Sequence, residues 1–198
     1  MGRRKTYDRT ELTDQAMRLF WEHGYHATSM RDVVDATGVN ASSIYAEFDS
    51  KQALYQEAVA RYDEIVVTGH FGALEQESSS LEEVAAVLQF FGEARTVQDA
   101  TIGCLLCNAA TELAPTPTLS RAIMDDYADR LVAAFGNALD NAAAAGRLDP
   151  AASTHELSRF FTVLLMGMFV LLRAEGDPAL LRAAANQGLA RLDSVTLS

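Results

Sequence analysis

The chain has 198 residues, of which 49% are hydrophobic, and a formal net charge of −11. A chain of this length can bury one substantial core, or a small core joined to a larger one. The acidic balance argues against binding to nucleic acid or anionic membrane through charge alone, and two cysteines are too few for a disulfide-stapled secreted scaffold.

The charge is unevenly distributed. Residues 1–62 hold half of the 16 Lys and Arg residues but only a third of the 27 Asp and Glu residues, so the acidity belongs to residues 63–198. Arg3, Arg4 and Lys5 precede polar residues rather than an apolar run, so we expect no secretory signal peptide. This basic segment either reaches DNA or is a disordered tip.

One segment, 160–172, is strongly apolar and is bracketed by Arg159 and Arg173. Its length is too short to span a bilayer, so we expect no membrane partner. Together with the absence of a signal peptide, this predicts a cytoplasmic protein.

Helix signals dominate the chain, and strand signals are almost absent. A first helix should end near Gly24, and Ser29 with Asp32 forms a capping box for a short second helix that Gly38 ends. Asn40 is a good N-cap for a short third helix.

The later helices follow from the same signals. Asp49 with Gln52 is expected to cap a fourth helix that reaches about Thr68, and Thr101 is expected to cap another at Ile102–Leu113. The remaining helices are predicted over 81–95, 118–145 and 154–173, with a last one ending near Leu192. The sequence therefore predicts an all-α protein of about nine helices.

Three short helices with a Gly turn between the second and third are typical of a helix-turn-helix. Gly38 permits the turn, and Val39 and Ile44 can lock the two helices together. The outward positions of the third helix are small: Asn40, Ala41, Ser42 and Ser43. A helix N-terminus attracts phosphate through its own N–H groups, so this helix needs no Lys or Arg. An ordinary three-helix corner is the alternative.

A run of fixed spacings surrounds this turn. It reads Ala16-x-x-Leu19-Phe20-x-x-x-Gly24-Tyr25, Thr28-Ser29-Met30, Val33-x-x-x-Thr37-Gly38-Val39 and Ser43-Ile44-Tyr45-x-x-Phe48-x-x-Lys51-x-x-Leu54. This run resembles the tetracycline-repressor (TetR) family of bacterial regulators. The resemblance implies a DNA-binding domain in residues 1–62 and a helical domain for effector binding and dimerisation in residues 63–198. It implies a homodimer on a palindromic double-stranded operator.

The resemblance also implies roles for single residues. Tyr45 and Lys51 would contact phosphates, and Thr28 or Ser29 would contact DNA at the start of the second helix. The residues expected to face the major groove are Asn40, Ala41, Ser42 and Ser43. Tyr45 could instead pack in the corner, and Asn40 could act only as a cap.

Three positions depart from the family pattern. Thr37 replaces a common Ala, Ser42 replaces a frequent Gly, and Glu47 stands where the family often has His. A carboxylate at Glu47 would repel phosphate unless it points away or accepts from a cytosine amino group. These departures leave the operator sequence open.

The two cysteines form a C-x-x-C spacing, Cys104-Leu105-Leu106-Cys107. No βαβ pattern surrounds it and the four His are scattered, so we expect neither a thioredoxin-like enzyme nor a metal site. With Thr101 as N-cap, Cys104 would lie in a first helical turn that favours thiolate, and Cys107 could resolve an oxidised Cys104. The alternative is two small core residues. The run Gly103-Cys104-Leu105 with Asn108 and Glu112 also resembles a segment of one branch of the TetR family, and this resemblance implies a response to oxidants or electrophiles, as in some members with a Cys at this place.

A polar strip runs along the same predicted helix. Cys104, Asn108 and Glu112 follow one another at i, i+4 and i+8, so they share one face. This strip either lines a pocket or meets a neighbouring helix.

The larger domain is expected to enclose an apolar cavity for a hydrophobic effector, because its helices are rich in aromatic and Met residues. The candidate lining residues are Phe90, Phe91, Asn108, Met124, Tyr127, Leu131, Phe161 and Met166. An effector must bind differently to the DNA-competent and DNA-incompetent arrangements. The fourth helix, Asp49 to about Thr68, is the expected lever because it begins at Lys51 and enters the larger domain.

The last two helices are expected to form the dimer interface, because the first of them is apolar on nearly every face and Gly167 permits close approach. The expected interface residues are Leu157, Phe160, Phe161, Leu164, Leu165, Met168, Leu171, Leu172, Leu180, Leu181, Ala184, Leu189 and Leu192.

These patterns predict a DNA-binding transcriptional regulator, a repressor released by a small hydrophobic effector. The chain shows no Gly-rich phosphate loop and no nucleophile with a nearby His, so we expect no enzyme and no cofactor. Two alternatives stay open: a repressor that senses oxidants or electrophiles through Cys104, and a helical adaptor that contacts only protein. The sequence also leaves activation open.

Overall fold

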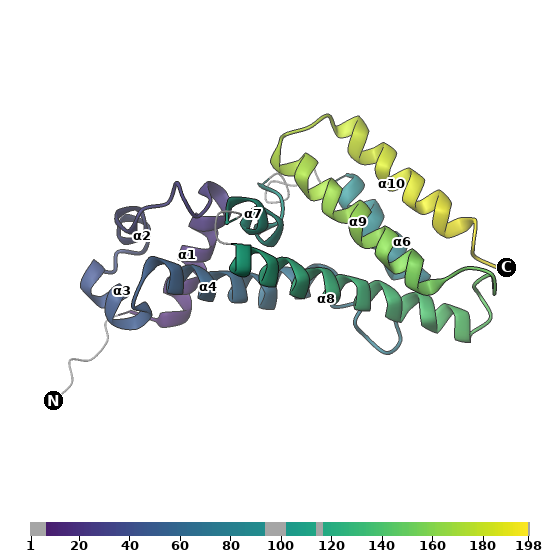
Figure 1. Ribbon diagram of the computed structural model, residues 1–198, viewed down its shortest axis with the longest axis horizontal. Helices are drawn as coiled ribbons and strands as arrows, with labels where there is room; N and C mark the ends of the chain where they lie inside the picture. The colour runs from purple at the N-terminus through teal and green to yellow at the C-terminus, as the bar shows by residue number, and fades with distance from the viewer. Residues whose placement is uncertain (1–6, 94–101, 114–116, 198) are drawn as a thin grey trace.

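The computed structural model describes residues 7–93, 102–113 and 117–197. It is an elongated helical molecule, with α1, α2 and α3 at one end and the C-terminus at the other (Figure 1). The α-helices are α1 (Arg9–His23), α2 (Met30–Thr37), α3 (Ala41–Phe48), α4 (Lys51–Tyr62), α5 (Thr68–Phe71), α6 (Leu81–Gly92), α7 (Leu105–Glu112), α8 (Pro117–Ala144), α9 (Thr154–Arg173) and α10 (Pro178–Asp193). The all-α prediction is confirmed.

A π-helical turn, η1 (Asp63–Val67), joins α4 to α5 without a break. With this run counted as one helix, the described part of the chain has nine helices, as predicted. The run extends beyond the predicted end near Thr68 to Phe71. Arg130 on α8 holds it, donating to the carboxylate of Asp63 over 2.7 Å and to the Thr68 hydroxyl over 2.9 Å.

The starts of α2 and α3 are the predicted ones. Ser29 and Asp32 form a reciprocal capping box, and the side chain of Asn40 accepts from the backbone N–H of Ser43. Gly38 ends α2 in the left-handed region with φ of 68°, and its N–H donates to the carbonyl of Val34. Local side-chain chemistry therefore sets the helix-turn-helix.

The predicted start of α4 is wrong by one residue. Ser50 is the N-cap and accepts from the backbone N–H of Ala53 over 3.0 Å. Asp49 instead ends α3 with φ of 53°, a conformation that Asp tolerates because its short side chain can bond locally. The expected cap of Asp49 with Gln52 therefore does not form.

The predicted start of α7 is also wrong. The helix begins at Leu105 and Cys104 is its N-cap, because Gly103 adopts a left-handed φ of 72° that ends any helix from Ile102. Cys104 therefore precedes the first turn that was expected to contain it. The expected cap, Thr101, lies outside the described residues.

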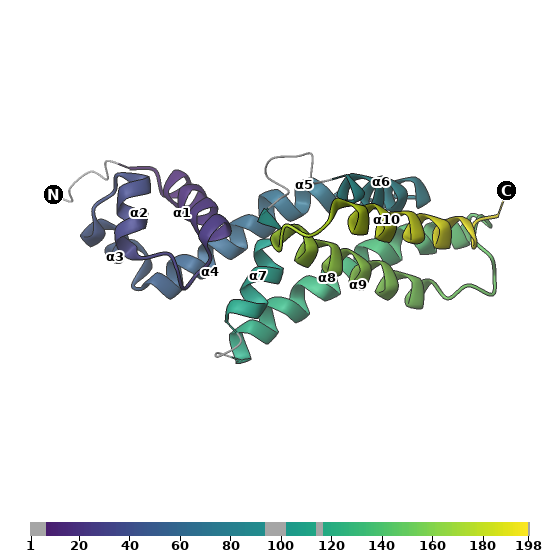
Figure 2. The same cartoon turned by 90° about the horizontal axis from the view of Figure 1, so that it is seen from above.

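The larger end of the molecule is a bundle of α6, α8, α9 and α10, in which α8 and α9 cross at an angle (Figure 2). Helix α9 is the centre of this bundle and packs against α8, α10 and α6. It has 20 residues, so it is long and apolar enough to span a membrane by composition, unlike the shorter segment considered above. About half of its residues face inward: 44% of its most apolar window is buried in the protein.

Candidate functional site

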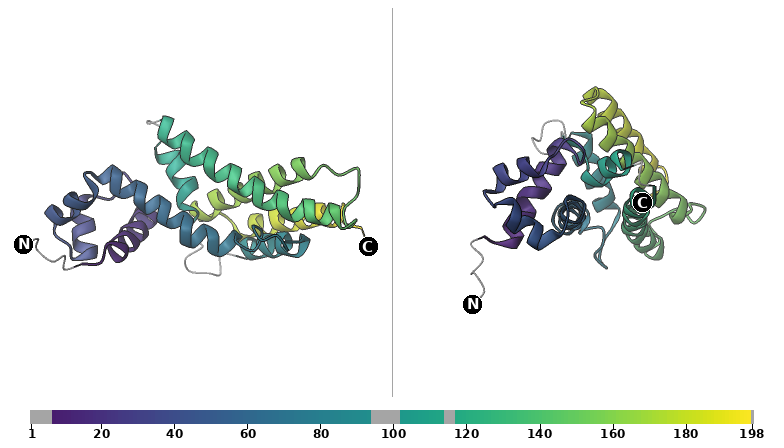
Figure 3. Two further views of the ribbon diagram at one scale, coloured as in Figure 1. Left: turned by 90° about the horizontal axis from the view of Figure 1, so that it is seen from below. Right: turned by 60° about the vertical axis from the view of Figure 1, so that its left-hand side comes forward.

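The outermost element of the N-terminal end is α3, on the side away from the bundle (Figure 3). Asn40, Ala41 and Ser42 are exposed at its start, whereas Ser43 is half-buried. The side-chain oxygen of Asn40 also accepts from the hydroxyl of Ser42 over 2.7 Å. Asn40 is thus a cap and also lies on the exposed surface, so its two expected roles are compatible.

The two expected phosphate contacts lie near this surface. Tyr45 is 44% exposed, so it does not pack in the corner between helices. Lys51 begins α4 and its Nζ lies 4.3 Å from the centre of the Tyr25 ring. Burial lowers the pKa of Lys51, while the carboxylates of Asp32 and Glu112 oppose this shift.

The other two expected DNA contacts, Thr28 and Ser29, lie at the start of α2 and differ in their exposure. Thr28 is buried and its hydroxyl donates to the carbonyl of Gly24 over 2.7 Å, so its side chain does not reach the surface. Ser29 is exposed, and its hydroxyl donates to Asp32 over 2.6 Å. Only Ser29 therefore offers a hydroxyl at this position.

A cavity of about 420 Å³ lies between the two ends of the molecule. Its walls are Trp21, Tyr62, Ile65, Val66, Val67, Gly69, His70, Phe71, Phe90, Phe91, Gly103, Tyr127, Phe169 and Leu172. No described lining residue is Lys, Arg, Asp or Glu, and eight carry an aromatic ring when His70 is included. Burial lowers the pKa of His70, so its neutral form is favoured. Such walls suit an apolar, aromatic ligand.

Three of the predicted lining residues, Phe90, Phe91 and Tyr127, are in these walls. Leu131 and Phe161 are fully buried in the core instead, and Met124, Met166 and Asn108 also lie away from the cavity. Sequence reasoning missed the contributions of α1, α4, η1 and α5, because it placed the cavity wholly within residues 81–173. Trp21 in particular comes from α1, at the N-terminal end of the molecule.

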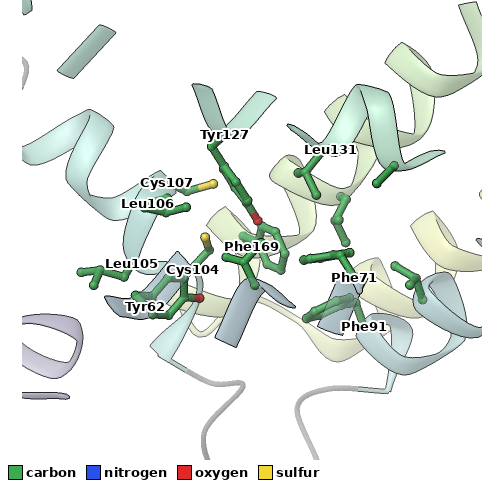
Figure 4. Packing of buried hydrophobic residues seen from close by; sticks show 14 of the residues in the cluster. Tyr62, Phe71, Phe91, Cys104, Leu105, Leu106, Cys107, Tyr127, Leu131 and Phe169 are labelled. Carbon is green, nitrogen blue, oxygen red and sulfur yellow. The ribbon is translucent and has the colours of Figure 1, made fainter. Parts of the chain in front are cut away.

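The two cysteines are buried next to this cavity. Figure 4 shows Cys104 and Cys107 at the start of α7, with the hydroxyl groups of Tyr62 and Tyr127 directed towards Cys104. Burial raises the pKa of the Cys104 thiol, but the thiol and backbone N–H of Cys107 and the two tyrosine hydroxyls outweigh it and lower that pKa to about 7. The cluster therefore favours one thiolate, on Cys104. Bonding to that thiolate and burial raise the pKa of Cys107.

The end of α1 is bonded to the larger bundle. The indole Nε1 of Trp21 donates to the carbonyl of Gly103 over 2.8 Å. Arg173, at the end of α9, donates to the carbonyls of Trp21 and Glu22 over 3.3 and 3.1 Å. These bonds form a joint between the end of α1 and the larger bundle. Since Trp21 and Gly103 both line the cavity, a ligand there would touch both sides of this joint.

One member of the polar strip, Glu112, also joins the two ends of the molecule. Asn108 donates to the carbonyl of Ile102, and the Glu112 carboxylate accepts from the backbone N–H of Tyr25. Asn108 therefore bonds to the segment just before its own helix, and Glu112 bonds to the turn between α1 and α2, so neither residue lines the cavity. Among the described residues, no three His, Cys, Asp or Glu side chains are grouped as a metal site would require.

Comparison with known proteins agrees with this arrangement. Residues 12–58 match the family model described as bacterial regulatory proteins, tetR family, and residues 80–187 match the model of a tetracyclin repressor-like C-terminal domain. The HTH-type transcriptional repressor ComR of Escherichia coli K12 is 33% identical over 180 residues, which cover 87% of this chain and 82% of ComR.

Solved structures share the whole fold. A cysteine mutant of the TetR family regulator CifR, in complex with a 26-bp operator DNA, matches with a TM-score of 0.82 and 25% identity, over 95% of this chain and 98% of CifR. The reduced form of Escherichia coli NemR matches in fold, with a TM-score of 0.77 and 16% identity over 96% of each chain. The chain belongs to the TetR family of bacterial transcriptional regulators.

Proposed function

We propose that this protein represses transcription as a homodimer on a palindromic operator, and that a small hydrophobic effector in the aromatic cavity releases it. The exposed start of α3, with Tyr45 and Lys51 beside it, supports operator binding. The similar protein ComR is a repressor, and the similar protein CifR forms an operator complex. Operator DNA also favours a cytoplasmic location without a membrane partner.

The dimer proposal rests on one face of α9. Phe160, Val163 and Val170 are 43%, 69% and 57% exposed, and they follow a spacing of i, i+3 and i+10. Gly167 completes this stripe at i+7, and no described atom beyond its chain neighbours and the adjacent backbone of α9 lies within 4 Å of where its Cβ would be. Leu180 on α10 is 53% exposed. An apolar stripe of this kind marks an interface.

This stripe differs from the predicted interface. Several residues assigned to it lie inside the protomer instead: Leu157, Phe161, Leu165, Met168, Leu172, Leu181 and Leu192 are all buried. Sequence alone identifies the excess of apolar residues on α9 but does not say which face the rest of the chain covers. We therefore assign the interface to the uncovered face.

The effector proposal rests on the position of the cavity. Its walls include Tyr62 and Val67, which lie in the helical run that begins at Lys51, and Trp21, which lies on the DNA-binding end. A ligand that packs against these residues in only one arrangement shifts the population towards it. We place the domain division after residue 62, where α4 passes into η1.

The two buried thiols, Cys104 and Cys107, favour a second trigger for release from DNA, namely chemical modification of Cys104. The lowered pKa of Cys104 gives it thiolate character near neutral pH, which is the reactive form of cysteine. Oxidation to a disulfide with Cys107, or addition of an electrophile, would disturb Tyr62 and Tyr127 at the cavity wall. Loss of a peroxide or electrophile response in Cys104→Ser, with effector release intact, would separate the two triggers.

Selection of DNA from a randomised pool by the wild-type protein tests operator binding. A palindromic consensus that shifts in a salt-sensitive manner is the expected result. Failure to select any duplex would instead favour the helical adaptor. A thermal-shift screen with apolar aromatic compounds then tests the cavity, because a ligand that binds only the folded state raises the Tm.

A further inference from the structure

The cavity between the two ends of the molecule differs between its mouth and its depth. Ile65, His70 and Phe90 line it with exposed side chains, so they mark the mouth. The deeper walls are buried and mostly apolar, and Figure 4 shows Phe71 and Phe91 among them. A ligand that fills the cavity would therefore have an apolar body, with any polar group placed at the mouth.

The polar side chains of the walls differ in whether they already have partners. The indole Nε1 of Trp21 donates to a backbone carbonyl over 2.8 Å. The hydroxyls of Tyr62 and Tyr127 are both directed towards Cys104. The imidazole of His70 is different, because neither ring nitrogen has a hydrogen-bond partner among the described residues. His70 is thus the described lining side chain that can still bond to a ligand.

His70 is held in place by aromatic rings. The centre of its imidazole lies 5.1 Å from that of the Phe90 ring and 5.4 Å from that of the Phe91 ring, both on α6. The ring of Phe71, the next residue on α5, lies at 6.3 Å. These contacts fix the imidazole beside the space that a planar ligand would occupy, so one aromatic cluster offers both packing and a hydrogen bond.

The state of the His70 imidazole decides which chemical group suits it. Burial lowers the pKa of His70, so the neutral ring predominates, with one N–H donor and one acceptor nitrogen. A hydroxyl suits either tautomer, because it can donate to the acceptor nitrogen or accept from the N–H. A carboxylate would need a cation, and no described lining residue is Lys or Arg. The net charge of −11 also disfavours an anion.

We propose that the cavity binds a hydroxylated aromatic molecule, with its rings among the buried walls and its hydroxyl bonded to the imidazole of His70 at the mouth. This inference rests on the proposed effector cavity and names the class of ligand within it. It makes His70 the residue that selects for the hydroxyl, whereas the aromatic walls accept apolar rings with or without one.

Calorimetric titration of the purified protein with three probes tests the inference. The probes are 2-naphthol, 2-methylnaphthalene and 2-naphthoate, of which the first two have nearly the same shape and differ in the hydroxyl. We expect the wild type to bind 2-naphthol about tenfold more tightly than either of the others, since one hydrogen bond separates them. No DNA is present, so the result does not depend on operator binding.

Two variants separate the hydrogen bond from packing. His70→Phe keeps an aromatic ring without a hydrogen-bonding group, so 2-naphthol should lose its tenfold advantage while 2-methylnaphthalene binds as before or more tightly. His70→Gln keeps a donor and an acceptor and should retain part of the advantage. His155→Phe, at an exposed position on α9 outside the cavity walls, is the matched control and should behave like the wild type.

The possible outcomes are distinct. An equal preference for 2-naphthol in the wild type and His70→Phe would overturn the role of His70, and so would tighter binding of 2-naphthoate than of 2-naphthol. If none of the three probes binds the wild type, the effector cavity of the proposed function fails and the ligand class fails with it. Binding of all three probes with equal affinity would leave the cavity standing and overturn only the selection by His70.

Discussion

The carboxylate of Glu112, the last residue of α7, accepts a hydrogen bond from the backbone N–H of Tyr25 over 2.6 Å. Tyr25 lies in the turn between α1 and α2, so this bond joins the larger bundle to the DNA-binding end. Gly24 makes the approach possible, because a Cβ at that position would overlap the carboxylate of Glu112. Its φ of 86° also requires glycine.

Replacement of Glu112 by Ala should loosen this joint. The partly buried N–H of Tyr25 would lose a charged acceptor, which should lower the free energy of unfolding by about 1.5 to 3 kcal/mol. Urea denaturation measures the loss. Glu77→Ala is the matched control, because Glu77 is an exposed carboxylate outside the joint, and it should leave stability unchanged. Equal effects of both changes would contradict a role for the joint.

Lys51→Ala should weaken binding to all duplexes alike. Lys51 lies at the start of α4 beside the exposed surface, where it would neutralise one phosphate. The slope of log affinity against log salt should fall by about one unit. Ser43→Ala should instead change which bases are selected. Arg31→Ala, at an exposed α2 position, gives a control for the loss of any one positive charge.

Val163→Glu should convert the proposed dimer to monomers. Val163 is 69% exposed in the protomer, so a charge there does not disturb the core, but two such charges would be buried in the proposed interface. Unpaired buried charges cost about 3 kcal/mol or more, which shifts the dissociation constant at least a hundredfold. Light scattering and operator binding are the measurements. A dimer that persists in Val163→Glu would place the interface elsewhere.

Phe90→Ala should reduce effector affinity with little loss of stability, because Phe90 lines the cavity and is 39% exposed. Leu197→Ala removes a similarly exposed apolar side chain outside the cavity and serves as the control. The Tm increase at a fixed concentration of a screened ligand should shrink in Phe90→Ala only. The same shrinkage in Leu197→Ala would show that the ligand binds another site.

Cys104 should make stability depend on pH. The pKa of its thiol falls from the ordinary value of 9.0 to about 7 on folding, so the folded state releases a proton more readily than the unfolded chain. The resulting stabilisation is fully present above the unfolded pKa and is lost as the pH falls through about 7. Denaturation of wild type and Cys104→Ser between these values should differ most at the alkaline end. Parallel pH profiles would exclude a thiolate at Cys104.

The sequence predicts the helix-turn-helix well because local chemistry sets its boundaries. Ser29 and Asn40 cap helices through atoms within three residues of themselves, so a single sequence contains the whole signal. The start of α7 escapes such reasoning because it depends on Gly103, which packs against Phe169 and Arg173 from α9. The spacing of residues in the sequence does not reveal this contact between Gly103 and α9.

The candidate site likewise has features that the local sequence predicts and features that depend on contacts between distant residues. The small residues of α3 follow from periodicity, but the pairing of Arg9 with Glu47 joins residues far apart in the chain. The cavity gathers its aromatic rings from α1, α4, α5, α6, α8 and α9. The apolar, aromatic composition of the cavity could be predicted from the residue content of the helices. Its position between the two ends of the molecule could not, because that position depends on how the helices pack together.

The π-turn between α4 and α5 has a torsional consequence. Each residue of an α-helix adds a rotation of about 100° about the helix axis but a rise of only about 1.5 Å. A shift of one residue in the hydrogen-bond register of the π-turn would therefore rotate the neighbouring helix strongly while translating it little. Ile65, Val66 and Val67 of this turn lie in the cavity wall, and the DNA-binding end continues from α4. A ligand that tightens or relaxes the π-turn by one hydrogen bond would rotate α3 about the α4 axis. In the proposed dimer, a palindromic operator is bound only when the α3 helices of both protomers face the major groove.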